Sequence, residues 1–528
     1  FIGNYHRNPF RGGSIPVSGA NKIDAVLGII DQDYVDTVNM KKLVEGVIPQ
    51  IFNELDPHSV YIPARDAQAV DEELEGSFSG IGVSFNLQTD TILVINVVPG
   101  GPAEKAGILP FDRIITINDS IFAGKKVDQN AVMKNLRGKK HSTVKLGIKR
   151  RGHQGLIEVE VTRGEVPVNS VDVAYEVAPG IGYIKVSKFT RTTYNEFITA
   201  IARLKGLGCK GFIVDLRDNT GGIMEIAVNM VNEFLPKGKL IVYTKGKAFP
   251  RTNMYANGTG TCINAPLVVL TNEGSASASE IFAGAIQDND RGTIVGRRTF
   301  GKGLVQTQFA LSDGSQLRLT IARYYTPSGR CIQKKYKLGD AADYEMDIYN
   351  RYMHGEFYSA DSIKTDSLPV YHTSIGRKVY GGGGIIPDVF IPSDTAGITS
   401  YFNSVTRSSN ILYLYALEYS DRNRDRLSKF KTWQDLDAYL EKQPLVENLA
   451  DFAEKQGVKK RPALIKISSQ LIRNYLEAYI ARNFLDEGGF YPILFKDDPV
   501  VLRAVSIIQD GRSYPTPGET PGNAANKL

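Results

Sequence analysis

The residues best suited to nucleophilic chemistry are three serines that alternate with alanines at positions 275–279. An apolar run at 266–271 precedes them and a helical pattern follows, which predicts a strand-to-helix turn at the serines. Gly274, Ala276 and Ala278 lack bulk, so the backbone can turn sharply and a substrate can approach. A serine at a helix start lies beside unpaired N–H groups that can stabilise an oxyanion. Serine and alanine are also ordinary cap and packing residues, so the run alone leaves both interpretations open.

A lysine between two glycines, Lys302, lies 302 − 277 = 25 residues after Ser277. An ordinary lysine with a pKa near 10.4 is neutral in about one molecule in two to three thousand at pH 7. Burial in an apolar pocket would lower that pKa and let the amine accept a serine proton. In a strand beginning at the lysine, Gln306 would lie on the same face and could orient the amine. The segment does not match the phosphate-binding GxxxxGK[ST] pattern.

The strings GSASASE and FGKG, together with this spacing, resemble the C-terminal processing peptidases, a family of tail-specific serine proteases. The resemblance implies that Ser277 is the nucleophile, Lys302 its general base and Gln306 the residue that orients the lysine. Ser279 is then expected in the first turn of the following helix. The family also implies a crotonase-like, ClpP-like α/β protease core and no metal or cofactor.

A second match is the segment DLRDNTGG at positions 215–222, which resembles the DLRxNxGG element of the same family. In the family a glycine of this element and the residue after the nucleophile donate the oxyanion-hole N–H groups. The resemblance therefore points to Ala278 with either Gly221 or Gly222, and Gly221 is preferred. Asp218 and Thr220 depart from the family pattern, and a simple glycine-rich turn is the alternative.

The segment FSGIGV resembles the carboxylate-binding loop of a PDZ domain, which holds peptide C-termini by strand addition. Glycines that flank an apolar residue allow successive N–H groups to converge on an anion. Phe111 and Asp119 stand where this kind of domain usually has glycine, so the turns there are expected to differ. A module that only packs is the alternative. The predicted contacts to a peptide C-terminus are those of Ser79, Gly80, Ile81, Gly82 and Val83.

Hydrophobic periodicity and changes in composition divide the chain into five parts. The pattern predicts a multidomain fold of mixed α/β and α+β class, with a barrel-like module, which the resemblance identifies as PDZ, between a helical segment and a largely parallel α/β core. Strands are predicted at 79–85 in the module and at 211–216 and 240–244 in the core, with a helix at 278–287. Polar, nearly aperiodic residues 334–380 indicate an insertion in the core. The predicted parts are a lead-in and helical segment (1–76), the PDZ domain (77–164), the protease core (165–395), a helical region (396–512) and a disordered tail (513–528).

The overall composition is that of an ordinary soluble protein. With 63 Lys+Arg and 57 Asp+Glu among 528 residues the net charge is 63 − 57 = +6, too small a surplus to indicate nucleic-acid binding. Three cysteines without a CxxC pair exclude a disulfide framework or zinc module. The chain starts at Phe1, so an N-terminal anchor removed before this start is expected, and the family resemblance implies a bacterial periplasmic or envelope location. The expected partners are protein or peptide substrates with free C-termini, and homodimerisation stays open.

Two alternatives compete with a peptidase. The same fold serves non-catalytic ligand carriers, so a peptide- or ligand-binding scaffold is the first, although a binder has no need for the Ser277–Lys302–Gln306 spacing. The second is an enzyme held inactive, with the lysine kept away from the serine until a peptide binds.

Overall fold

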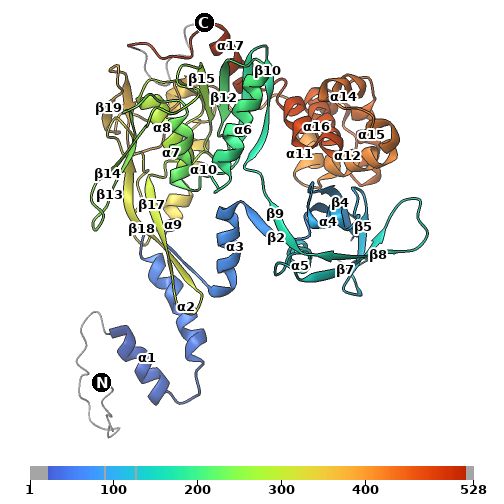
Figure 1. Ribbon diagram of the computed structural model, residues 1–528, viewed down its shortest axis with the longest axis horizontal. Coiled ribbons are helices and arrows are strands. Elements are labelled where there is room, and N and C mark those ends of the chain that lie inside the picture. The colour runs from blue at the N-terminus through green and yellow to red at the C-terminus, as the bar shows by residue number, and fades with distance from the viewer. Residues whose placement is uncertain (1–21, 89–90, 125–127, 519–528) are drawn as a thin grey trace.

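The computed structural model describes residues 22–88, 91–124 and 128–518. Figure 1 shows an α/β core, a strand-rich module beside it, a helical unit next to that module, and an N-terminal arm below the core. The predicted lead-in at 1–21 lies outside the described residues. The arm consists of α1 (Lys22–Asp33), α2 (Met40–Asn53) and α3 (Ala64–Glu75), as the helical periodicity predicts.

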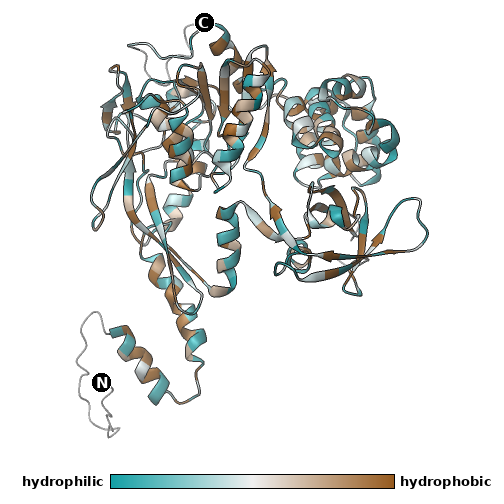
Figure 2. Cartoon of the chain, viewed as in Figure 1, coloured by the Kyte–Doolittle hydropathy of each residue, from teal (hydrophilic) through white to brown (hydrophobic). Residues whose placement is uncertain are grey.

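A six-stranded sheet forms the centre of the core. Its first two strands are antiparallel and the others parallel, which confirms the predicted largely parallel sheet. Because both faces are covered, the inner strands are continuous apolar runs, visible as brown arrows in Figure 2. In sheet order the strands are β10 (Val171–Ala178), β11 (Ile181–Val186), β12 (Gly211–Asp215), β15 (Leu267–Thr271), β16 (Thr293–Gly296) and β21 (Val389–Phe390).

Helices cover both faces of this sheet. On one face lie α6 (Thr193–Gly206), α7 (Met224–Asn232) and α8 (Ala278–Asp288), with Phe197, Phe234 and Phe282 in the apolar layer between helices and sheet. On the other face lies α17 (Pro499–Gln509), near the C-terminal end of the chain. A distant C-terminal segment therefore completes the core that positions the serine turn at the start of α8.

A second sheet lies beside the first and is antiparallel. The run at 240–244 was expected in the parallel core, but it forms a strand of this second sheet instead. The reason lies in pairing partners far apart in sequence, which local periodicity does not reveal. The strands are β1 (Val60–Ile62), β18 (Gln316–Tyr325), β13 (Leu240–Lys245) and β14 (Thr252–Tyr255), with β17 (Leu304–Ala310) paired to β18.

The strand-rich module has a sheet of its own and connects to the core through a two-stranded ribbon. The run at 79–85 was expected as one strand, but it is interrupted at Ile81–Gly82, where Gly82 has φ 78°. The ribbon is β2 (Ser77–Gly80) with β9 (Gly164–Pro167). The module contains β3 (Val83–Gln88), β4 (Thr91–Val97), α4 (Pro102–Lys105), β5 (Arg113–Ile117), β6 (Ser120–Ile121), α5 (Gln129–Leu136), β7 (Thr143–Lys149) and β8 (Ile157–Thr162).

The helical unit, residues 400–494, has a separate apolar core. Its last helix contains a break at Asp486, with φ 52° and ψ −149°. No helix in the described part of the chain is both long enough and apolar enough to cross a bilayer. The unit contains α11 (Ser400–Thr406), α12 (Ile411–Arg422), α13 (Arg424–Leu427), α14 (Trp433–Leu440), α15 (Leu445–Lys455) and α16 (Pro462–Leu494).

Residues 334–380 have more structure than their aperiodic sequence indicates. Short elements are held there by buried polar contacts, including those of Arg351 with the backbone carbonyls of Arg298 and Thr299. These carbonyls belong to the loop that leads to Lys302. The elements are α9 (Ala341–Glu345), α10 (Asp347–Met353), a 3₁₀ turn (Ala360–Ser362), β19 (Val370–His372) and β20 (Lys378–Tyr380).

The first two residues of the predicted disordered tail, Ser513 and Tyr514, are held by hydrogen bonds. The Ser513 carbonyl accepts a hydrogen bond from Thr293 Oγ1 (2.9 Å), and the Tyr514 hydroxyl donates to the Asn264 carbonyl (3.0 Å). These two residues therefore belong to the core. Residues 519–528 of the predicted tail lie outside the described residues.

Candidate active site

Ser277 lies at the turn between β15 and α8, immediately before the helix. Its backbone has φ 56° and ψ −113°, a region that residues other than glycine rarely adopt. Such strain persists where surrounding contacts hold it, and it occurs at the nucleophile of sharp strand–helix turns. The geometry therefore agrees with the sharp turn expected from the small residues around the serines.

The two neighbouring serines hold the turn rather than face the solvent. Ser275 and Ser279 are fully buried. The Ser275 hydroxyl donates to the Leu216 carbonyl (2.7 Å), and the Ser279 hydroxyl donates to the Asn219 carbonyl (2.8 Å). Ser279 lies in the first turn of α8, as predicted. Both serines thus tie the nucleophile turn to the glycine-rich segment after β12.

A buried carboxylate, Glu280, connects the serine turn to the lysine loop. Its Oε2 accepts the backbone N–H groups of Ser277 (2.9 Å) and Lys302 (2.8 Å). Its Oε1 accepts the Gly301 N–H (2.7 Å) and the Thr299 hydroxyl (2.5 Å). Burial raises the pKa of Glu280 to about 7, whereas the four donors favour the ionised form. Glu280 therefore bridges two backbone segments that are 25 residues apart.

The Lys302 amine donates to Gln306 Oε1 at 3.1 Å, as the sequence spacing predicts. Lys302 itself lies two residues before β17, so this pairing does not depend on both residues being in one strand. The Gln306 amide group donates in turn to the His58 backbone carbonyl, which fixes the orientation of its oxygen toward the amine. The Tyr324 hydroxyl donates to the carbonyls of Ser277 (3.2 Å) and Lys302 (2.8 Å).

His58 and Tyr344 brace this arrangement from two distant parts of the chain. The His58 ring nitrogen and the Tyr344 hydroxyl are 2.9 Å apart, and the two rings meet edge to face. Tyr344 belongs to α9, in the segment predicted as an insertion. Burial, assisted by the charge of Lys302, lowers the pKa of His58 to about 4, so its ring is neutral at pH 7. The insertion therefore supports the lysine environment.

Burial lowers the pKa of Lys302 to about 8, and the positive charge of Arg318 adds to this effect. Asp56 and Glu280 oppose it. A lysine with a pKa of 8 is neutral in about one molecule in ten at pH 7, compared with one in a few thousand for an ordinary lysine. The environment thus provides the neutral amine that a general base requires.

The predicted oxyanion donors lie against Ser277. A Cβ on Gly221 would be 2.7 Å from the Ser277 Cβ and 2.9 Å from the Ala278 nitrogen, so only glycine fits there. The Gly221 N–H itself donates to Asn219 Oδ1 at 2.9 Å. Within the described part of the chain, the N–H groups of Gly222 and Ala278 donate to no acceptor. In this conformation Gly222 and Ala278 are therefore the open donors.

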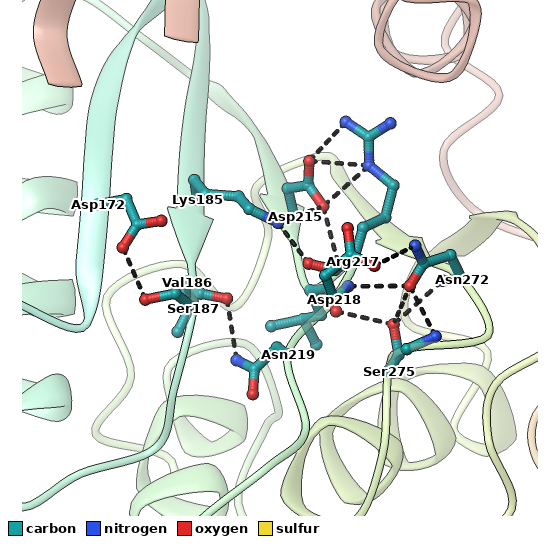
Figure 3. A network of polar contacts seen from close by, with 12 residues as sticks. Asp172, Lys185, Val186, Ser187, Asp215, Arg217, Asp218, Asn219, Asn272 and Ser275 are labelled. Carbon is teal, nitrogen blue, oxygen red and sulfur yellow. Dashed lines mark hydrogen bonds and ion pairs between the residues drawn. The ribbon is translucent and has the colours of Figure 1, made fainter. Parts of the chain in front are cut away.

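A buried charge network holds the segment after β12 (Figure 3). Asp215 accepts the Tyr183 hydroxyl (2.6 Å) and Arg217 Nη2 (2.6 Å), and Lys185 is 3.5 Å away. Burial would raise the pKa of Asp215, but the cations of Arg217 and Lys185 outweigh it and hold that pKa well below its usual range. Arg217 also pairs with Asp498 at 2.7 Å, at the start of α17.

Asn272 connects the same segment to the serine turn, as Figure 3 shows. Its Oδ1 accepts the Asp218 N–H (2.8 Å), and its Nδ2 donates to Asp218 Oδ1 (2.8 Å). This double contact holds Asp218 at φ 61°, a position where asparagine is usual in the resembling family. The departure noted in the sequence is therefore accommodated by a reciprocal side-chain and backbone pair.

The site opens into a cavity of about 700 Å³. Ser277, Lys302, Gln306, Gly221 and Gly222 all line it, whereas the buried Ala278 does not. Within the described residues, no hydrogen bond joins the Ser277 hydroxyl to the Lys302 amine. The remaining wall is mixed, and its apolar side chains include those of Ile223, Met224, Ile281, Leu304 and Val305.

The predicted peptide-binding loop divides between two elements. Ser79 and Gly80 lie in β2, where they pair with β9, while Val83 begins β3. Among the described residues, the N–H groups of Ile81 and Gly82 donate to no acceptor. Since β3 is the end strand of its sheet, its outer edge is open to strand addition. The structure therefore leaves Ile81 and Gly82 open to an anion, next to a free strand edge.

The family model "Peptidase family S41" matches residues 180–346, and a PDZ-domain model matches residues 79–161. The carboxy-terminal processing protease CtpA of Bacillus subtilis is 38% identical over 316 residues, which are 60% of this chain and 67% of that protein. The chain belongs to peptidase family S41. CtpB of the same organism is 34% identical over 318 residues, which are 60% of this chain and 66% of that protein. The matched part thus spans about two thirds of each relative.

Two solved structures are similar to parts of this S41 chain. The photosystem II D1 C-terminal processing protease is 30% identical and covers 60% of this chain and 91% of its own, with a TM-score of 0.34. The peptide-bound PDZ domain of a carboxy-terminal protease from Vibrio cholerae is 25% identical and covers 17% of this chain and 99% of its own, with a TM-score of 0.16. Residues 401–486 match a family of unknown function, DUF8443.

Several residues of this S41 site were not predicted from the sequence. Glu280 is one of them, although a glutamate three residues after a serine at a helix start is the capping-box signal. Nothing in the local sequence links Arg318, Tyr324 or Tyr344 to Lys302, because these contacts join separate elements.

We expect Glu280→Gln to loosen the site, because the new amide would turn a donor toward four donors in a fully buried position. The loss in unfolding free energy is expected at about 1–3 kcal/mol. Hydrogen–deuterium exchange should accelerate at residues 277–281 and 299–303. Glu225→Gln is the control, since this exposed carboxylate lines the same cavity. Equal exchange in the two variants would contradict the bridging role of Glu280.

Proposed function

We propose that this S41 chain is a serine endopeptidase that uses a Ser277–Lys302 dyad on a crotonase-like core. The observation that carries the proposal is a buried lysine amine with a lowered pKa and a strained serine in one cavity. Gln306 accepts a hydrogen bond from the amine and so orients it. Neither a large net charge nor a thiol is needed for this chemistry.

In the proposed reaction, Ser277 Oγ attacks the scissile carbonyl carbon and transfers its proton to the neutral Lys302 amine. The oxyanion is stabilised by the Ala278 N–H and by the Gly221–Gly222 pair, of which Gly222 has the open donor. The lysine then returns the proton to the leaving amine, and an acyl-enzyme forms. A water molecule, deprotonated by Lys302, then attacks the acyl carbon. The bond from that carbon to Ser277 Oγ breaks, Lys302 returns the proton to Oγ, and the carboxylic acid product leaves.

This reaction requires the Lys302 amine to approach the Ser277 hydroxyl. Hydrogen-bond reach is about 2.6–3.2 Å, and catalytic hydrogen bonds are often longer in unliganded sites. In the conformation described, the amine bonds to Gln306 instead. A rotation of the lysine side chain within the cavity would complete the dyad without moving the backbones that Glu280 and Tyr324 hold.

We further propose that the PDZ domain holds the substrate's C-terminus while Ser277 cleaves upstream. The open N–H groups of Ile81 and Gly82 suit a carboxylate, and the free edge of β3 suits an added strand. Proteins or peptides with free C-termini are the substrates this arrangement fits. A bacterial periplasmic or envelope location and homodimerisation stay predictions, for which the family resemblance is the only support.

Replacing Ser277 or Lys302 tests the dyad directly. Ser277→Ala and Lys302→Ala are each expected to lower kcat/KM by roughly 10³-fold or more. Lys302→Arg should be equally inactive, because arginine keeps the charge and reach but does not deprotonate. Labelling by a fluorophosphonate probe should vanish in Ser277→Ala and persist in Ser279→Ala, whose hydroxyl is buried. Full activity of Lys302→Arg would exclude the lysine as base, and an unlabelled wild-type protein would favour the binding scaffold.

The pH dependence follows from the lysine. Because only the neutral amine accepts a proton, kcat/KM should rise about tenfold per pH unit below the pKa of Lys302 and level off above about 8. Arg318→Gln removes a cation that lowers this pKa, so the pH–rate curve should shift to higher pH. Arg323→Gln, on the same strand but exposed, should leave the curve in place. A curve that moves equally in both variants would contradict the electrostatic role of Arg318.

Masking the substrate's C-terminus tests the PDZ role. A peptide with an apolar free C-terminus should be cleaved at lower KM than the same peptide with a C-terminal amide, because the amide lacks the charge that the Ile81–Gly82 loop would hold. The kcat of the two peptides should agree, since binding is remote from Ser277. Identical KM values would remove the PDZ domain from substrate recognition and leave the dyad untouched.

A further inference from the structure

The strand-rich PDZ domain is attached to the core in two places. One is the β2–β9 ribbon, supported by an ion pair between Arg137 and Glu72 (3.8 Å). A two-stranded ribbon by itself is a weak and flexible connection. The other attachment is indirect and runs through the helical unit, residues 400–494, which lies beside the PDZ domain in Figure 1.

An apolar cluster forms the contact between the PDZ domain and the helical unit. Leu93 and Ile95 of β4 are buried there, although they lie on the strand face opposite to Ile92 and Val94, which fill the PDZ core. A strand with a solvated face alternates apolar and polar residues, whereas TILVINV is apolar on both faces. The sequence of β4 thus indicates a second partner. The helical unit supplies Leu417, Tyr413 and Phe484 to this cluster.

Phe111 is the anchor of this contact. It stands where the resembling domains have glycine, and it adopts φ 70°, a conformation that is unfavourable for a bulky side chain. The residue is 9% exposed, and its ring lies 6.2 Å from the Phe484 ring, measured between centroids. The Arg424 guanidinium lies 4.2 Å from the centre of the Phe111 ring. Backbone strain at a residue that replaces glycine is explained if the ring is needed at the contact.

Polar contacts surround the aromatic anchor. Arg424 Nη2 donates to the Pro110 carbonyl (3.0 Å), and Arg151 Nη1 donates to the Asp421 carbonyl (3.1 Å). Asn96 donates to Asp486, the residue at the break in α16, which also has a positive φ. A residue with a positive φ therefore lies on each side of the contact. Such strain persists only where the surrounding structure holds it.

The helical unit is also fixed to the protease core. The Tyr491 hydroxyl at the end of α16 donates to Asp172 of β10 at 2.7 Å. The Tyr491 side chain packs against the central-sheet cluster that α17 completes. The unit therefore contacts the core through Tyr491, near the C-terminal end of α16. It contacts the PDZ domain through Phe484 and Asp486, at the break in the same helix. Residues 400–494 therefore connect the core to the PDZ domain.

We propose that the helical unit, which matches a family of unknown function, is a strut that fixes the angle of the PDZ domain relative to the protease core. None of the residues in the contact is among those predicted to bind the peptide carboxylate, namely residues 79–83. Because the peptide C-terminus and the scissile bond must reach two fixed sites, a constant angle sets the distance between them. Only this consequence for cleavage rests on the proposed function.

The test measures the angle without requiring catalysis. Spin labels are placed at cysteines introduced by Thr143→Cys in β7 and Ala202→Cys in α6, both exposed, in a Cys331→Ser background. Double electron–electron resonance on the full chain then gives the distribution of distances between the label on the PDZ domain and the label on the core. Wild type is expected to show a narrow distribution, and Phe111→Gly a broad one. The glycine relieves the backbone strain at 111, so the PDZ domain should keep its fold and its affinity for a C-terminal peptide.

Asp119→Gly is the matched control. It also restores a glycine at a positive φ (62°) in the same domain, but it lies outside the contact. It should leave the distribution narrow. Leu417→Ser weakens the contact from the side of the helical unit and leaves the PDZ sequence intact. It should broaden the distance distribution as Phe111→Gly does. A narrow distribution in both contact variants, or equal broadening in Asp119→Gly, would overturn the strut. If wild type proved unable to cleave any peptide, the proposed function would fail while this distance result stood.

Discussion

The Glu280 carboxylate is the interaction on which the candidate active site depends. Ser277 and Lys302 belong to separate loops, and no strand pairing connects them directly. Glu280 Oε2 accepts the backbone N–H groups of Ser277 and Lys302, so one oxygen atom holds the two residues close together. A buried acceptor with four donors is costly to rearrange, because any partner that leaves it would remain unsatisfied away from water. The strained backbone of Ser277 can persist only under such restraint.

The remaining polar contacts extend this restraint outward. Ser275, Ser279 and Asn272 connect the serine turn to the glycine-rich segment, and Arg217 connects that segment to Asp498 of α17. Each link is a hydrogen bond or ion pair in a buried position, where the effective dielectric is low and geometry is strongly enforced. The Ser277 turn, the Gly221–Gly222 segment and the last core helix therefore form one connected assembly. The conformation of the serine turn thus depends on residues more than 200 positions away.

Sequence reasoning succeeded where the physical signal is local. The helix at 278–287 and the strand at 211–216 follow from periodicity, and both agree with the structure within a residue or two. The contact between Lys302 and Gln306 follows from their spacing, whereas the role of Ser277 rests on the family resemblance and stays a prediction. Sequence reasoning failed where the determinants are distant. Residues 334–380 seemed aperiodic because ion pairs such as Arg377–Asp388, rather than a continuous apolar face, hold them. The strand at 240–244 was misplaced because sheet membership is decided by pairing, which one-dimensional periodicity does not contain.

Phe111 shows that a departure from a family pattern can carry more information than a match. A glycine at a positive φ costs nothing and contacts nothing, so it says only that the chain turns. A phenylalanine at φ 70° is unfavourable unless its ring gains more by burial than its backbone loses. Phe111 and the strand TILVINV, which is apolar on both faces, together indicate that the PDZ domain has a second packing surface. The two observations are independent, since one concerns backbone conformation and the other side-chain alternation. Their agreement on the same face of the PDZ domain is the reason to regard the contact with residues 400–494 as a built feature rather than an incidental touch.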